Sequence, residues 1–285
     1  MNNYGFLIDM DGVIYRGHEL IPGAKEFISK LLSRDIPFLF LTNNSQRNRR
    51  DVVIKLKRMG ISVDEKHIFT CAMATARYLA NRKPKGTAYV IGEGGLLTAL
   101  HQNGYSIVDD DPDYVIIGEG RTIMLESVDK AINMVMKGAK LIATNMDPNC
   151  PSANNSIRSG CGAFVSMIEI ATNRKAFSVG KPSPVMMRTA KAELMTRSAN
   201  TIMIGDTMET DILGGVQMGF KTVLTLSGAT KREELSKYAY SPDFIINSIE
   251  DLLNPETFDK LTRTEGMEDS FKAEKPYPEN KVLVR

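Results

Sequence analysis

Two acidic motifs in the sequence each follow a short apolar segment. The motif DMDG at 9–12 follows the segment FLI at 6–8, and Asp206 and Asp211 follow the segment TIMI at 201–204. Either motif alone is typical of a turn or a solvated loop. Because both stand at the end of an apolar segment, they instead indicate carboxylates at the carboxyl edge of a sheet, where α/β folds place their chemistry.

The spacing of these carboxylates predicts a common ligand. Residues two apart in an extended backbone point to the same side, so Asp9 and Asp11 can converge on one ligand. Gly12 allows the chain to turn and its N–H groups to approach an anion. Clustered carboxylates repel one another unless a cation lies between them. Mg²⁺ binds one or two carboxylates together with water and substrate phosphate, so we expect a Mg²⁺ site that also receives a phosphate group.

Two further segments carry groups that suit a phosphate. The segment LTNNS at 41–45 offers a hydroxyl, amides and free backbone N–H groups ahead of a helix, although an ordinary helix N-cap has the same residue types. The segment GKP at 180–182 places a lysine before a helix that proline can start, although most lysines are solvated surface groups. The candidate phosphate-binding residues are Gly12, Thr42, Asn43, Asn44, Lys181 and Thr207.

A framework of parallel strands must position these motifs. Runs that are apolar throughout, instead of alternating, are typical of buried parallel strands. Amphipathic helical patterns lie between them, which indicates a parallel, doubly wound α/β sheet. The clearest helical face comprises Ala24, Phe27, Ile28, Leu31 and Leu32. Strands are predicted at 6–8, 38–41, 201–204, 222–226 and 244–246.

A second alternation of strands and helices interrupts the first. It predicts strands at 88–91, 114–117 and 141–144, and the polar segment at 81–86 is typical of a linker into this region. We therefore expect an inserted α/β domain. The predicted division is a first core part at 1–82, the insertion at 83–179, a second core part at 180–261 and a poorly ordered, polar tail at 262–285.

Composition and charge exclude several classes of protein. Hydrophobic residues make up 42% and charged residues 25%, as in globular proteins, and a net charge of +2 does not indicate a nucleic-acid polymer or a membrane surface as partner. No apolar run approaches the ~20 residues of a membrane span, and no secretory signal is evident. The cysteines Cys71, Cys150 and Cys161 form no CxxC pair, so we expect reduced thiols and a cytoplasmic protein.

In this order the motifs resemble those of the haloacid dehalogenase (HAD) superfamily of phosphatases, and in particular its NagD-like, 4-nitrophenylphosphatase-type branch. The first motif is DMDGVIYRG at 9–17, the second LTNNS at 41–45, the third VGKP at 179–182 and the fourth lies within 205–212. Further similarity extends to about Leu253. The resemblance implies a Rossmann-like doubly wound core with an inserted α/β cap, in agreement with the insertion inferred above.

The resemblance also implies the roles of the acidic residues. Asp9 would be the nucleophile and a metal ligand, and Asp11 the general acid–base, with its backbone carbonyl on the metal. Asp206 would bind Mg²⁺ directly. Asp211 would support the metal site from outside the set of direct ligands. The implied activity is Mg²⁺-dependent hydrolysis of small phosphate monoesters through an aspartyl-phosphate intermediate.

The remaining implied roles concern phosphate binding and the cap. Thr42 and Lys181 would hold the phosphate, with Asn43 nearby. The cap departs from the family at Met146, where proline is common, and at 158–162, where a proline-glycine turn is common. Both places are where substrate selection is expected. The candidate residues for contact with the leaving group are Asn145, Asp147 and Arg158, for which ordinary surface polarity is the alternative.

Three functional classes stay open. The favoured one is a phosphatase for nucleotide monophosphates or for esters such as p-nitrophenyl phosphate; the second is a sugar- or glycolytic-phosphate phosphatase, or a phosphotransferase. The third is a non-catalytic phosphate-binding regulatory module, which would not need both Asp9 and Asp11. Cys161 lies between two glycines but has no evident histidine partner as a nucleophile. The expected ligand is a small phosphate ester, and a homodimer or a higher oligomer is left open.

Overall fold

The computed structural model of the chain describes residues 4–151 and 156–263. By their contacts these residues form two compact units. The first comprises the described parts of 1–40, 58–61 and 190–285, and the second those of 41–57 and 62–189. The predicted tail lies, from residue 264 on, outside the described residues, and the division of the chain at 83 and 179 stays a prediction.

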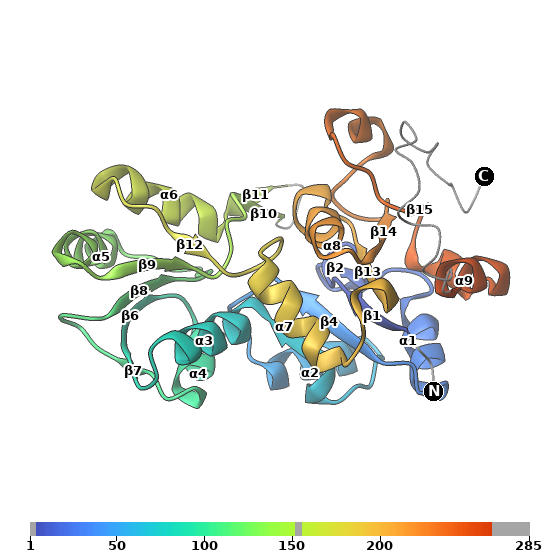
Figure 1. The fold of residues 1–285 in the computed structure, drawn as a ribbon, viewed down its shortest axis with the longest axis horizontal. Helices are drawn as coiled ribbons and strands as arrows, with labels where there is room; N and C mark the ends of the chain where they lie inside the picture. Colours follow the sequence, from blue (N-terminus) through green and yellow to red (C-terminus); the bar gives the residue numbers. More distant parts are fainter. Residues whose placement is uncertain (1–3, 152–155, 264–285) are drawn as a thin grey trace. The chain divides into compact units, whose positions relative to one another are not determined.

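The first unit is built on parallel strands in the order β15-β14-β13-β1-β4 (Figure 1). All four residues of β1 are buried, because β1 has a strand on each side and is covered on both faces. Its elements are β1 (Gly5–Ile8), β2 (Tyr15–Arg16), β3 (Glu19–Leu20), α1 (Ala24–Ser33), β13 (Thr201–Gly205), α8 (Leu213–Met218), β14 (Lys221–Thr225), β15 (Phe244–Ile246) and α9 (Pro255–Thr262).

Three elements span the points at which the chain passes from one unit to the other. They are β4 (Phe38–Thr42), α2 (Arg49–Arg58) and α7 (Pro184–Leu194).

The strand order of the first unit reverses direction at β1. After β1 the chain continues to β4 on one side, and it returns later to β13 on the other side, both pairings being parallel. Such a reversal creates a topological switch point at the carboxyl ends of the two central strands, where open α/β sheets bind ligands. Asp9 and Asp206 are the residues that directly follow β1 and β13.

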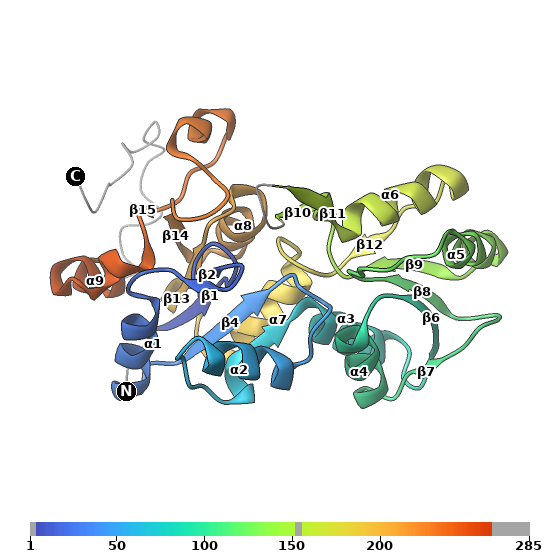
Figure 2. The ribbon, with the colours of Figure 1, turned by 180° about the vertical axis from the view of Figure 1, so that it is seen from behind.

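An aromatic cluster fixes two helices of the first unit beside this sheet. The ring of Phe6 on β1 lies 5.8 Å from that of Phe27 on α1, edge to face, and 6.0 Å from that of Phe258 on α9. Edge-to-face pairs stabilise a core by about 0.5–1.5 kcal/mol beyond the area that they bury. The apolar face predicted for α1 is confirmed except at Leu32, which is 38% exposed. Figure 2 shows α1 and α9 near one another from behind.

The second unit contains its own parallel sheet, in the order β12-β9-β8-β6-β7. In both views α5 and α6 cover one face of this sheet, and α3 and α4 lie at the other (Figures 1 and 2). Its elements are β5 (Ile68–Thr70), α3 (Cys71–Arg82), β6 (Thr87–Ile91), α4 (Gly94–Gln102), β7 (Ser106–Ile107), β8 (Tyr114–Ile117), α5 (Leu125–Lys137), β9 (Lys140–Ala143), β10 (Asn149–Pro151), β11 (Ile157–Ser159), α6 (Cys161–Thr172) and β12 (Phe177–Ser178).

The sequence predicts the long strands to within about a residue and misses several other elements. The predicted linker at 81–86 begins inside α3, whose last residues are Asn81 and Arg82. The antiparallel hairpin of β10 and β11 and the short strands β5, β7 and β12 were not predicted. These strands have two or three residues each, which is too few for an apolar period to show.

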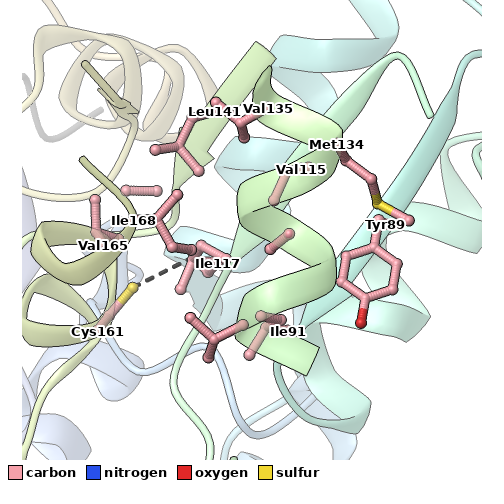
Figure 3. Close-up of a cluster of buried hydrophobic side chains, with 13 residues drawn as sticks. Tyr89, Ile91, Val115, Ile117, Met134, Val135, Leu141, Cys161, Val165 and Ile168 are labelled. Carbon is pink, nitrogen blue, oxygen red and sulfur yellow. Dashed lines mark hydrogen bonds between the residues drawn. The ribbon is translucent and has the colours of Figure 1, made fainter. Parts of the chain in front are cut away.

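Side chains from both layers fill the core between the sheet and α5 and α6 (Figure 3). Cys161, at the start of α6, is fully buried there, and its thiol donates a hydrogen bond to the carbonyl of Ile117 on β8 at 3.3 Å. Loss of solvent, the largest cause, raises the pKa of Cys161 to about 11. The same cause raises the pKa of Cys71 and brings that of Cys150 to about 12. These thiols are therefore protonated near neutral pH, which argues against Cys161 as a nucleophile.

No helix among the described residues is both long and apolar enough to cross a bilayer.

The raised pKa of Cys161 predicts slow alkylation in the folded protein. Because the thiolate is the reactive form and the pKa is raised to about 11, only about one thiol in a thousand is ionised at pH 8. We expect iodoacetamide to label Cys161 at least a hundredfold more slowly in the native protein than in urea, as measured by peptide mass spectrometry. Equal labelling rates in the two states would contradict this burial.

Candidate active site

Three buried carboxylates come together at the switch point of the first unit. Ligand oxygens of Asp9, Asp206 and Asp211 all lie within 4.8 Å of one another. The side chains are 8%, 6% and 1% exposed, respectively. Asp9 is placed by the strand register, since its N–H donates to the carbonyl of Ile204 on β13 at 2.9 Å. The structure thus brings together three of the four acidic residues that the sequence predicts for the metal site.

The loop after β14 holds the carboxylate of Asp206. The N–H of Ala229 donates to Asp206 Oδ2 at 2.7 Å, and the hydroxyl of Thr207 donates to Oδ1 at 3.0 Å. A Cβ at Gly228, or at Gly12 with its φ of +83°, would overlap this carboxylate. Glycine is needed at both positions because two backbone segments approach Asp206 closely.

A single wide helical turn, Met208–Ile212, carries Asp211 back to the cluster. The N–H of Thr207 donates to Asp211 Oδ2 at 3.2 Å. Gly205 lies directly behind, and a Cβ there would overlap the Asp211 side chain. The predicted phosphate ligand Thr207 therefore lies beside both Asp206 and Asp211, and it bonds to each of them.

The carboxylate of Asp11 does not belong to this group of three. A turn follows Asp11, in which the carbonyl of Met10 accepts the N–H of Ile14 at 2.8 Å. The Asp11 side chain is exposed and accepts the hydroxyl of Tyr15 at 3.4 Å. The convergence of the Asp9 and Asp11 side chains on one ligand stays a prediction.

The chemistry of the cluster fits a hard divalent cation. Two carboxylates 4 Å apart repel each other by about 4 kcal/mol at an effective dielectric constant of ~20. Three of them, all buried, raise this cost further, and hydrogen bonds from Ala229 and Thr207 to Asp206 and Asp211 offset part of it. A cation among these oxygens would offset the repulsion, and an all-oxygen donor set of this kind suits Mg²⁺.

In the second unit, Asn43 is the centre of a buried hydrogen-bond network. Its Oδ1 accepts the N–H of Lys181 at 2.8 Å, and its Nδ2 donates to the carbonyl of Lys181 at 3.1 Å. The same Nδ2 donates to a carboxylate oxygen of Asp147 at 3.1 Å. Asn145 donates to the carbonyl of Asn43 at 2.8 Å and accepts the N–H of Asp147 at 3.0 Å. The network joins residues from three distant parts of the chain.

This network sets the backbone that carries the other predicted phosphate ligands. Thr42 is buried, and its hydroxyl accepts the N–H of Asn44 at 3.1 Å. Asn44 in turn accepts the N–H of Gln46 at 3.0 Å. Lys181 is 3% exposed. Thr42 precedes Asn43 in the chain, and the Lys181 backbone is bonded to Asn43; their binding of phosphate stays a prediction.

Arg158, the third candidate cap residue, has other neighbours than Asn145 and Asp147. Arg158, on β11, lies 3.9 Å from a carboxylate oxygen of Glu119, which is buried. The N–H of Glu119 donates to the hydroxyl of Ser45 at 2.8 Å, and the thiol of Cys150 donates to Glu119 at 3.7 Å. Arg158 is therefore positioned by Glu119, whereas Asn145 and Asp147 are positioned by Asn43.

Sequence reasoning missed two functional elements of these surroundings. Gly228 and Ala229 hold Asp206, and the signal for them is a glycine in a loop directly after the strand β14. Glu119 was missed as well, although it follows the strand β8 between Gly118 and Gly120, as Asp206 follows β13. An acidic residue beside glycine at the end of an apolar strand is the shared signal.

Comparison with known proteins agrees with this geometry. A family model described as haloacid dehalogenase-like hydrolase matches residues 6–106, and a second, HAD-hydrolase-like, matches residues 178–252. The chain is 42% identical over 250 residues to a dihydroxyacetone phosphatase of Corynebacterium glutamicum, covering 88% of this chain and 90% of the relative. It is 35% identical to the ribonucleotide monophosphatase NagD of Escherichia coli, covering 86% and 96%.

A solved structure extends the similarity to the fold. The p-nitrophenyl phosphatase from Archaeoglobus fulgidus superposes with a TM-score of 0.83 at 34% identity, covering 89% of this chain and 99% of that one. Its similarity spans both the Rossmann-like core and the inserted cap that the sequence predicts. The chain belongs to the haloacid dehalogenase-like hydrolases, as a NagD-like phosphoric monoester hydrolase.

Proposed function

We propose that the protein is a Mg²⁺-dependent phosphatase that hydrolyses small phosphate monoesters through a phosphorylated Asp9. The observation that carries this proposal is the buried cluster of Asp9, Asp206 and Asp211 at the switch point of the first unit. A cluster of this kind is costly without a cation, and a non-catalytic binding module would not need both Asp9 and Asp11. The membership in a family of phosphatases supports the same reading.

In the proposed reaction, Asp9 and Asp11 divide the chemistry between them. A carboxylate oxygen of Asp9 attacks phosphorus, and the bond between phosphorus and the ester oxygen breaks. Asp11 donates a proton to the leaving alcohol and then takes one from the attacking water. That water cleaves the bond between phosphorus and Asp9, which releases inorganic phosphate and restores the carboxylate. The exposed side chain of Asp11 supports this role, because it must meet both alcohol and water.

The other residues bind and orient. Asp9, Asp206 and the backbone carbonyl of Asp11 would hold Mg²⁺, with Asp211 completing the site. When bound, the ion offsets the negative charge of the transferring phosphoryl group. Thr42 and Lys181 would hold the phosphate oxygens, and Asn43 fixes the backbone of Lys181 by two hydrogen bonds. Asn145, Asp147 and Arg158 stay candidates for contact with the leaving group.

Two substrate classes have support from relatives. Nucleotide monophosphates and p-nitrophenyl phosphate are favoured by the likeness to a ribonucleotide monophosphatase and a p-nitrophenyl phosphatase. A triose phosphate is the second candidate, because the dihydroxyacetone phosphatase is 42% identical to this chain. A cytoplasmic location, the absence of nucleic-acid and membrane partners, and the oligomeric state stay predictions.

Replacing the nucleophile tests the reaction directly. We expect Asp9→Asn to lower the turnover of p-nitrophenyl phosphate in Mg²⁺ by about 10³-fold or more, since an amide does not form the acyl phosphate and single nucleophile removals have losses of this size. Asp109→Asn, at an exposed residue, serves as the matched control and should keep full activity. Undiminished turnover in a folded Asp9→Asn protein would refute the assignment.

The glycine behind Asp206 offers a test of the metal site that leaves every carboxylate in place. A Cβ in Gly228→Ala would overlap the carboxylate of Asp206 and displace it. We expect the Mg²⁺ concentration for half-maximal activity to rise tenfold or more, with the metal ligands unaltered in type.

Gly94→Ala is the control for this variant, because a Cβ at Gly94 meets no atom within 4 Å. Its Mg²⁺ requirement should equal that of the unaltered protein. The proposed role of Asp206 fails if Gly228→Ala and Gly94→Ala need the same Mg²⁺ concentration.

A further inference from the structure

The second unit has a pocket of about 750 Å³ that neither the carboxylate cluster nor the Asn43 network uses. Sites for small molecules typically have volumes of about 300–1,000 Å³. The residues of the pocket that bear on its chemistry are Tyr78, Phe177, Arg82, Lys140, Arg174 and Lys175. We call it the basic aromatic pocket. No acidic residue lines it among the residues that the structure describes.

An aromatic platform forms one part of this pocket. The rings of Tyr78 on α3 and Phe177 on β12 are stacked, with centroids 4.9 Å apart and planes inclined by 22°. The guanidinium of Arg82 lies 5.4 Å from the Tyr78 ring centroid. Phe177 is 42% exposed, so part of its side chain is open to solvent. A flat ring from a ligand would extend the stack on its exposed side.

The positive charges of the pocket are mostly not neutralised by protein. Lys175 pairs with Glu169 at 3.3 Å. Across residues 4–151 and 156–263, no ion pair involves Arg82, Lys140 or Arg174, and all three side chains are exposed. Three uncompensated cations around one concavity create a positive potential that attracts an anion. Two of them are arginines, whose planar guanidinium binds phosphate in a bidentate manner.

The position of the pocket separates it from the phosphate-binding candidates of the same unit. Tyr114, Lys140 and Phe177 are the first residues of the parallel strands β8, β9 and β12, so the pocket lies at the amino edge of the sheet. Asn145 and Lys181 follow the carboxyl ends of β9 and β12. The two edges are about 10 Å apart along β9, at ~3.3 Å for each residue. The two places therefore lie at opposite edges of the sheet, with β9 running between them.

We propose that the basic aromatic pocket is a second binding site, for a nucleoside phosphate. The base stacks on Phe177, and the phosphate groups bind between Arg82, Arg174 and Lys140. A flat ring and a phosphate on one molecule use both features of the pocket, whereas inorganic phosphate or a sugar phosphate uses only one. Binding here does not depend on which ester the enzyme hydrolyses at Asp9.

The sequence allows a specific reporter for this site. The chain contains no tryptophan, so Phe177→Trp places a single tryptophan in the pocket. We expect ADP, in EDTA to prevent turnover, to quench its fluorescence with saturation. Adenosine and pyrophosphate, which each have one of the two features, should bind at least tenfold more weakly. Calorimetry of ADP with the unaltered chain checks that the reporter has not created the site.

Two variants in the reporter background separate this pocket from the catalytic site. Arg174→Glu, at an exposed residue, should weaken ADP binding at least tenfold, because it reverses a charge beside the phosphates. Lys181→Ala should leave the quenching unchanged. The proposal is overturned if millimolar ADP causes no saturable quenching, if Lys181→Ala abolishes it, or if Arg174→Glu does not weaken it. It is also overturned if sedimentation shows that the unaltered chain is an oligomer and that Arg174→Glu dissociates it. The pocket would then be covered by a subunit interface.

Discussion

The repulsion among three buried carboxylates is the constraint on which the rest of the first unit depends. Asp9, Asp206 and Asp211 are held within a few ångströms of one another and away from solvent. Burying such charges together costs free energy, and a bound cation would offset that cost. Hydrogen bonds and close backbone approaches hold two of these carboxylates, Asp206 and Asp211, in place.

Those features come from separate parts of the sequence and meet only in the fold. The reversal of strand order at β1 places the carboxyl ends of β1 and β13 side by side. Gly12 and Gly228 allow two backbone segments to close around Asp206, and the N–H of Ala229 binds it. The hydroxyl of Ser227 also donates to the carbonyl of Gly12 at 2.7 Å, which ties the first motif to the loop after β14. The sheet brings the carboxylates to the same edge. The loops with Gly12 and Gly228 then determine where the Asp206 carboxylate lies.

The parts of this arrangement that follow from local pattern were predictable from the sequence. The strands β1, β4 and β13 are apolar throughout, and their carboxyl ends mark Asp9, Thr42 and Asp206. The exposure of the Asp11 side chain, in contrast to the burial of Asp9, was not predictable from residue spacing, because spacing does not record which side chains the fold covers.

The bonds around Asn43 and the pairing of Glu119 with Arg158 were not predictable either. They join residues that are more than thirty positions apart, and no local period of the sequence records such contacts.

The most direct test of the central claim is a calorimetric titration of the purified chain with Mg²⁺, without substrate. The account predicts one Mg²⁺ ion bound per chain, and a large loss of that binding in Asp206→Asn, in which one of the three charges is removed while the side-chain shape is kept. A chain that binds no Mg²⁺, or an Asp206→Asn variant that binds it with unchanged affinity, would contradict the claim that the carboxylates gather around a cation.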